Sequence, residues 1–260
     1  MRWVPEAPTG VGALVVAGSS GRIDSPRAEL LAQHGAIAES IRWFGGPGQH
    51  DGPWEIPLEL FLGRVADLAR DCDRVLVLGT SFGAEAALLT GSQSPEVTAV
   101  VAFAPSDVVW AGVRPDGTQT SHWSVDGAPL PYVPFDEDWQ SGDDIPAYVG
   151  LYEASRNRFP ERVLDAAIAV EEIKDLVLVA GGDDQVWPAT AMCDSIQARR
   201  TAHGLTTTIV SDPAAGHRTI LPGEPVVSGG VRMRRGGTEK ADRSLGTAAW
   251  AKINDLLELK

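Results

Sequence analysis

The stretch RVLVLGTSFGAEAALL, residues 74–89, decides the fold class of this chain. Residues 74–78 form an apolar run, which is typical of a strand buried on both faces of a parallel sheet. Gly79-Thr80-Ser81-Phe82-Gly83 follows at once, and the small residues of 82–89 predict a helix. G-x-S-x-G between a strand and a helix is the pattern of a nucleophile elbow, where the glycines leave room for a strained serine. An ordinary glycine-rich turn is the alternative for this segment alone.

Strands and helices alternate on both sides of this stretch, which is typical of an α/β fold with a mostly parallel sheet and helices on both faces. Residues 105–160 break the alternation and are rich in Pro, Gly, Asp and aromatic residues. We therefore predict one domain over residues 1–260, with a lid-like insertion at about 105–160. The predicted strands are 11–17, 36–43, 74–78, 97–103, 176–180 and 206–211, and the predicted helices are 26–34, 57–70, 82–89, 189–203 and 243–258.

A serine hydroxyl needs a base to act as a nucleophile, and two later strand ends supply candidates for an acid and a histidine base. Asp183 and Asp184 follow the strand at 176–180, where an acid can orient an imidazole. His217 follows the strand at 206–211 in a loop, and the other four histidines do not follow a late strand in this way. The order Ser81, Asp184, His217 is that of the α/β-hydrolase triad. The backbone N–H groups of Ser19 and Phe82 are the predicted oxyanion donors, although the loop at Ser19 could simply cap the next helix.

Several segments resemble the acyl-CoA thioesterase and bile-acid-CoA:amino-acid N-acyltransferase family, in its C-terminal catalytic domain. The resemblance to dienelactone-hydrolase-like enzymes is more distant. The matching segments are IPLELF (56–61), GTSFGAEAALL (79–89), VTAVVAFAPSDVVWAG (97–112), SHWSVDGAPLPYVP (121–134), GGDDQVWP (181–188) and AAGHRTILPGEP (214–225).

The resemblance implies an α/β-hydrolase fold and a triad on Ser81, Asp184 and His217. Asp184 is preferred over Asp183 because the acid of related hydrolases stands four residues before a proline, here Pro188. It also implies a serine hydrolase that cleaves an acyl thioester or ester through an acyl-enzyme. A serine nucleophile resembles the thioesterase members, since the acyltransferase members carry cysteine. Transfer of the acyl group to an amine or alcohol, a general carboxylesterase or lactone hydrolase, and a non-catalytic binding protein are the alternatives.

Aromatic residues of the insertion are candidates for an acyl pocket or, equally, for a small core that holds the segment together. The candidates for substrate binding are Trp110, Trp123, Tyr132 and Trp139. Glu85, one turn after Ser81, is predicted to pair with Arg27, and a second carboxylate in the site is the alternative. Arg232, Arg234 and Arg235 form a basic cluster that could meet a phosphate group or lie in solvent.

Composition excludes several classes of protein. The formal charge of −13 argues against a nucleic-acid binder, and the hydrophobic content of 43% excludes a disordered chain. The two cysteines are too few for a disulfide scaffold, and no Cys/His cluster has zinc-ligand spacing. The sequence predicts a cytoplasmic protein that acts on a small molecule, with no metal, no cofactor and no membrane span, and it leaves the oligomeric state open.

Overall fold

A seven-stranded sheet forms the centre of the computed structural model, which describes residues 1–227 and 230–258. The sheet order is β1-β3-β2-β5-β6-β11-β12, and every neighbouring pair is parallel except the edge pair β1·β3. The strands are β1 Arg2–Trp3, β2 Val11–Val16, β3 Ile37–Ser40, β5 Arg74–Thr80, β6 Val97–Phe103, β11 Asp175–Gly181 and β12 Thr208–Asp212. The predicted mostly parallel sheet is confirmed.

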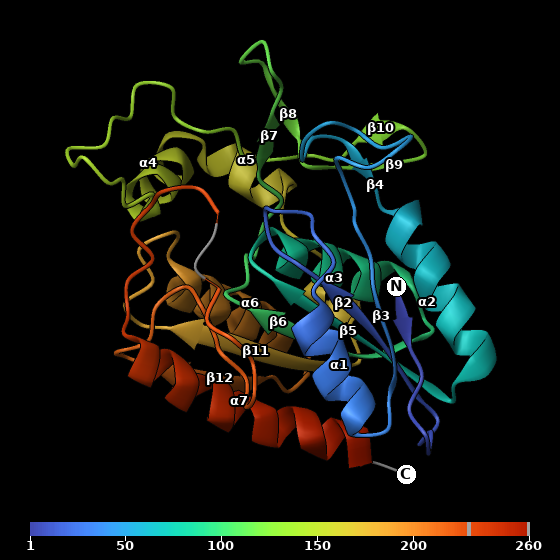
Figure 1. Cartoon of the computed structure of the whole chain (residues 1–260). Coiled ribbons are helices and arrows are strands. Elements are labelled where there is room, and N and C mark those ends of the chain that lie inside the picture. The colour runs from blue at the N-terminus through green and yellow to red at the C-terminus, as the bar shows by residue number, and fades with distance from the viewer. Residues whose placement is uncertain (228–229, 259–260) are drawn as a thin grey trace.

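Helices cover both faces of the sheet because the strands bury alternate side chains on opposite sides. Val75 and Val77 of β5 belong to the hydrophobic cluster that also contains side chains of α2, α3 and α6, whereas Leu76 and Leu78 belong to the cluster that contains side chains of α1 and α7. Figure 1 shows α1 and α7 together on the near face of the sheet. These helices are α1 Ser25–Gln33, α2 Glu59–Asp71, α3 Phe82–Gln93, α6 Ala189–Ala202 and α7 Glu239–Glu258.

The insertion has more structure than its sequence predicts. It consists of short strands above the main sheet, followed by two helices (Figure 1). One small sheet has the order β10-β9-β4, so it pairs the insertion with a strand that precedes α2. The elements are β4 Ile56–Pro57, β7 Ala111–Val113, β8 Gln119–Ser121, β9 Trp123–Val125, β10 Ala128–Pro129, α4 Val149–Arg158 and α5 Pro160–Asp165, with a 3-10 turn at Val170–Glu172.

Strand register brings the candidate site together. Thr80 is aligned with Phe103, Phe103 with Val179, and Gly181 with Asp212. Because these strands are parallel, their carboxyl ends share one edge of the sheet, where ligands of such folds bind. The segments that carry Ser81, Asp184 and His217 all leave from this edge. Within the described part of the chain, none of the helices combines the length and apolar character that a membrane crossing demands.

Candidate active site

Ser81 lies on a sharp turn between β5 and α3. Its backbone has φ 58° and ψ −124°, a conformation that residues other than glycine rarely adopt. The flanking glycines allow the turn to form. A Cβ at Gly79 would lie 1.9 Å from the carbonyl oxygen of Gly83, and a Cβ at Gly83 would lie 2.4 Å from that of Ala17. Ser81 therefore has the strained strand-to-helix geometry of a nucleophile elbow.

His217 and Asp184 form a buried pair at the same edge. His217 Nδ1 lies 2.7 Å from Asp184 Oδ2, and both residues are less than a tenth exposed. The second carboxylate oxygen, Oδ1, accepts hydrogen bonds from the N–H groups of Val186 at 2.8 Å and Trp187 at 3.2 Å. Since every contact orients the carboxylate, Asp184 can hold the imidazole in one tautomer with the proton on Nδ1.

Asp183 points away from the imidazole. Its oxygens accept hydrogen bonds from the backbone N–H of Gly237 and the side-chain amide of Gln185, each at 2.8 Å. These two hydrogen bonds lower the pKa of the exposed Asp183 carboxyl. Of the two neighbouring acids, Asp184 is the one that contacts His217.

A cavity of about 1100 Å³ lies over this edge and includes Ser81 and His217 in its wall. Ser19, in the loop after β2, and Phe82, the first residue of α3, also line it. The N–H of Phe82 has no intrahelical partner, because it opens the helix. Among the described residues, no hydrogen bond joins the Ser81 hydroxyl to the His217 imidazole. Such hydrogen bonds often tighten only when substrate binds.

The insertion contributes to this cavity, but through other residues than the sequence indicated. Trp110 and Trp123 are fully buried in the core and do not line the cavity. Trp139 packs against Tyr148, with ring centroids 6.1 Å apart, and is also absent from the cavity wall. The residues of the insertion that do line the cavity are Ala111, Val113, His122, Phe135, Tyr148, Leu151 and Tyr152.

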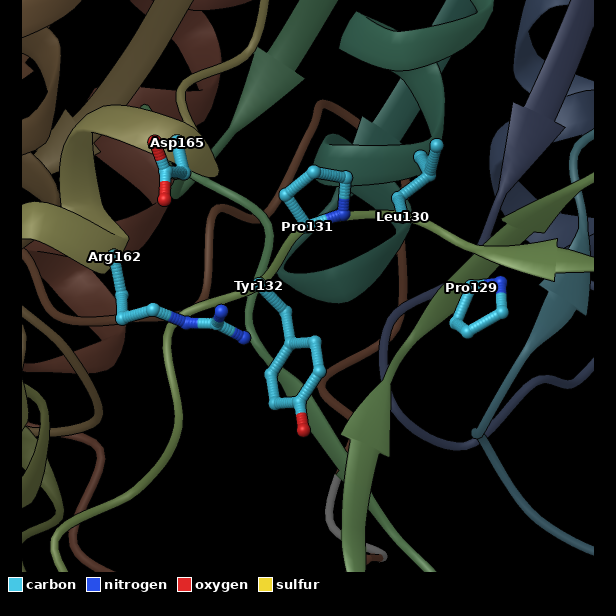
Figure 2. Close-up of a pocket in the computed structure, with 6 residues that line it drawn as sticks. All are labelled: Pro129, Leu130, Pro131, Tyr132, Arg162 and Asp165. Carbon is cyan, nitrogen blue, oxygen red and sulfur yellow. The ribbon is translucent and has the colours of Figure 1, made fainter.

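Tyr132 lines a separate hollow of about 430 Å³ on the surface of the insertion (Figure 2). Figure 2 shows the Arg162 side chain extending towards the Tyr132 ring, and its guanidinium carbon lies 5.2 Å from the ring centroid. The other residues that line it are Pro129, Leu130, Pro131 and Asp165. Neither Ser81 nor His217 lines this hollow. Tyr132, which the sequence suggested as a substrate-binding residue, therefore lies outside the cavity that contains Ser81.

Two buried ionisable residues lie beside the elbow. Glu85 Oε2 accepts hydrogen bonds from the Trp123 indole at 2.9 Å and from the N–H of Trp110 at 3.3 Å. Burial raises the pKa of Glu85 to about 8, against the opposing effect of these hydrogen bonds, so the carboxyl is mostly protonated at neutral pH. The expectation that Glu85 pairs with Arg27 is wrong, because Arg27 forms its ion pair with Glu224.

His122 is the second buried ionisable residue, and it was not among the site residues predicted from the sequence. Its ring centroid lies 3.8 Å from that of Phe82, and the side chain lines the cavity. Burial lowers the pKa of His122 to about 3, so the imidazole is neutral. Its Nδ1 has no hydrogen-bond partner among the described residues. In an irregular segment, nothing in the neighbouring sequence distinguishes a buried histidine such as His122 from an exposed one.

Four arginines among the described residues also line the cavity. They are Arg22 after β2, Arg27 on α1, Arg218 next to His217, and Arg235 in the loop before α7. Burial and the neighbouring charge of Arg235 lower the pKa of Arg218. Of the predicted basic cluster, only Arg235 lines the cavity. Arg234 forms an ion pair with Asp143 at 3.1 Å, and Arg232 is exposed. Within residues 1–227 and 230–258, no three His, Cys, Asp or Glu side chains are grouped as metal ligands.

Solved structures with the same architecture are distant in sequence. A Klebsiella pneumoniae protein provisionally named a dienelactone hydrolase is 15% identical, with a TM-score of 0.55 over 98% of this chain and 89% of that one. A structure described as a lipase in its open form is 13% identical, with a TM-score of 0.56 over 99% and 94%. The esterase domain of a Rhodothermus marinus protein is 13% identical, with a TM-score of 0.51 over 98% and 91%. These likenesses establish the α/β-hydrolase fold.

The sequence relation is more specific. No curated protein matches the sequence. The family described as BAAT / acyl-CoA thioester hydrolase C terminal matches residues 69–258, which include Ser81, Asp184 and His217 and exceed half of the chain. The chain belongs to the BAAT / acyl-CoA thioester hydrolase C-terminal family.

Proposed function

We propose that this protein hydrolyses an acyl thioester, or a related ester, through an acyl-enzyme on Ser81. The observation that carries the proposal is the 2.7 Å contact between His217 and Asp184 at the cavity that also exposes the strained Ser81. A nucleophile, a base and an acid that orients the base are what acyl transfer to a serine requires.

The chemistry follows from which nitrogen of His217 is free. Because Nδ1 faces the Asp184 carboxylate, Nε2 accepts the Ser81 proton as Oγ attacks the substrate carbonyl. The amides of Phe82 and Ser19 are the proposed donors to the oxyanion that develops. As the C–S or C–O bond breaks, His217 gives its proton to the leaving group. Water then attacks the acyl-enzyme, and His217 acts as base again.

Two features favour a thioester with an anionic leaving group, such as an acyl-CoA. The first is membership of an acyl-CoA thioester hydrolase family. The second is the presence of Arg22, Arg218 and Arg235 in the cavity wall, in addition to the Arg27–Glu224 ion pair, in a chain of formal charge −13. Guanidinium groups bind phosphate oxygens in bidentate fashion. The aromatic and aliphatic wall from the insertion, with Phe135, Leu151 and Tyr152, suits the acyl chain.

A hydrolysis screen over acyl-CoA thioesters and aryl esters of matched chain length tests this function. We expect turnover that Ser81→Ala lowers by about 10⁴- to 10⁶-fold, together with loss of labelling by a fluorophosphonate probe. Ser92→Ala, at the far end of α3, is the matched control and should keep full activity. A Ser81→Ala variant with more than about a tenth of the wild-type rate would mean that the nucleophile lies elsewhere. Product analysis with added amines would reveal acyl transfer in place of hydrolysis.

A further inference from the structure

Arg27 is a buried arginine whose hydrogen bonds join segments far apart in the sequence. It lies on α1 and is only 5% exposed. Its Nε and Nη2 donate to the two carboxylate oxygens of Glu224 at 2.8 and 3.0 Å. Nη1 donates to Thr80 Oγ1 at 2.9 Å, and Nη2 also donates to the Thr219 carbonyl at 3.1 Å. The guanidinium carbon lies 4.3 Å from the ring centroid of Phe103.

Three of these partners, Thr80, Thr219 and Phe103, lie close to a residue of the candidate triad. Thr80 precedes Ser81 in the chain, and Thr219 lies two residues after His217. The carbonyl of Phe103 accepts the backbone N–H of Ser81 at 2.9 Å. One side chain therefore connects the strand end that carries the nucleophile with the loop that carries the base.

The pair with Glu224 keeps both groups charged inside the protein. Burial alone would raise the pKa of Glu224, but the charge and hydrogen bonds of Arg27 lower it below its ordinary value. Glu224 in turn accepts the N–H of Leu221 at 2.9 Å, which fixes the turn that follows Thr219. A buried ion pair adds little net stability compared with apolar residues of similar volume, so stability alone does not account for this one.

We propose that Arg27 is a positioning residue, which sets the separation of Ser81 and His217 by holding Thr80, Thr219 and Glu224 at once. This inference rests on the proposed function. Proton transfer between serine and imidazole depends on a near-attack geometry. Only the planar, forked guanidinium presents donors in all of these directions, and a lysine ammonium at the same place has no such fork.

The test is steady-state hydrolysis by Arg27→Lys, together with its rate of fluorophosphonate labelling. A misplacement of about 1 Å lowers catalysis by about 100-fold, and we expect a loss of that size in kcat and in labelling, with KM for a short aryl ester within about twofold of wild type. Arg200→Lys is the matched control. Arg200 is also fully buried and donates to the carbonyls of Val170 and Ile173 at 2.6 Å, but it does not line the cavity. We expect this control to lower Tm and leave kcat unchanged.

A double variant separates positioning from folding. Arg27→Met combined with Glu224→Leu replaces the ion pair by apolar side chains, so it should unfold at a Tm close to wild type yet retain the low kcat. Wild-type kcat in either Arg27 variant would overturn the inference, and so would a loss confined to KM, which would make Arg27 a substrate-binding group. If the wild-type protein neither hydrolyses any ester or thioester nor reacts with the probe, the proposed function itself fails.

Discussion

The buried carboxyl of Glu85 should make the stability of this protein fall as the pH rises. The folded-state pKa of about 8 lies about 3.5 above the ordinary value of 4.5, and at about 1.4 kcal/mol for each pH unit the ionisation of Glu85 accounts for about 5 kcal/mol. The unfolded chain loses this proton as the pH passes about 4.5, whereas the folded chain keeps it until about 8. The stabilisation from protonated Glu85 is therefore complete below pH 4.5 and is lost progressively as the pH rises to about 8.

The substitution Glu85→Gln isolates this effect. Glutamine keeps an acceptor for the Trp123 indole and the Trp110 amide but does not titrate. We expect the free energy of unfolding of wild type, relative to the variant, to fall by about 3 kcal/mol between pH 5.5 and pH 9 in urea titrations. The exposed Glu153→Gln is the matched control for the loss of one carboxyl group from the chain. Parallel pH curves for wild type and Glu85→Gln would show that the carboxyl is ionised in the folded protein.

Asp184→Asn should lower kcat by about 10⁴-fold, because the amide favours the wrong tautomer of His217. Asp183→Asn should leave kcat nearly unchanged in the same ester assay. A larger loss in Asp183→Asn than in Asp184→Asn would assign the acid role to Asp183. Gly79→Ala places a Cβ 1.9 Å from a backbone oxygen, so we expect a lower Tm and no labelling by the fluorophosphonate, and a fully labelled variant would contradict the close fit. Trp110→Ala should lower the free energy of unfolding by about 3–5 kcal/mol with little change in chain-length preference. Leu151→Trp, in the cavity wall, should shift that preference towards shorter acyl groups. Comparing kcat/KM over a series of acyl chain lengths measures the preference of both variants. A changed preference in Trp110→Ala would mean that Trp110 contacts the acyl chain.

The central sheet and the elbow could be predicted because their signals are local. Strands buried on both faces appear as continuous apolar runs, so β2, β5, β6 and β11 were predicted to within one or two residues. The pattern G-x-S-x-G is contiguous in the sequence, although only Gly79 is required by a contact within the turn, with Gly83, whereas Gly83 is required by the carbonyls at the end of β2. The order of strands pointed to the acids after β11, and the resemblance to related hydrolases, through the spacing to Pro188, then favoured Asp184, which lies against His217 in the structure.

Contacts between distant segments could not be predicted. Arg27 and Glu224 are 197 residues apart, and neither has a neighbour that indicates its partner. Trp110 and Trp123 are of a residue type that often lines ligand pockets, but whether an aromatic ring faces a cavity or the core depends on tertiary packing. The strands of the insertion are two or three residues long, too short for an alternating pattern to be visible.

For the mechanism proposed above, the order of strands in the sheet also determines when Ser81 can become reactive during synthesis. The five neighbouring strands β1-β3-β2-β5-β6 all come from residues up to Phe103, so they can pair before the rest of the chain exists. A ribosome-bound chain can therefore complete the turn at Ser81 while Asp184 and His217 are still untranslated. A serine hydroxyl without its base is a poor nucleophile. In the proposed mechanism the nascent chain thus carries an inert serine, which gains reactivity only after β12 has joined β11 at the edge of the sheet.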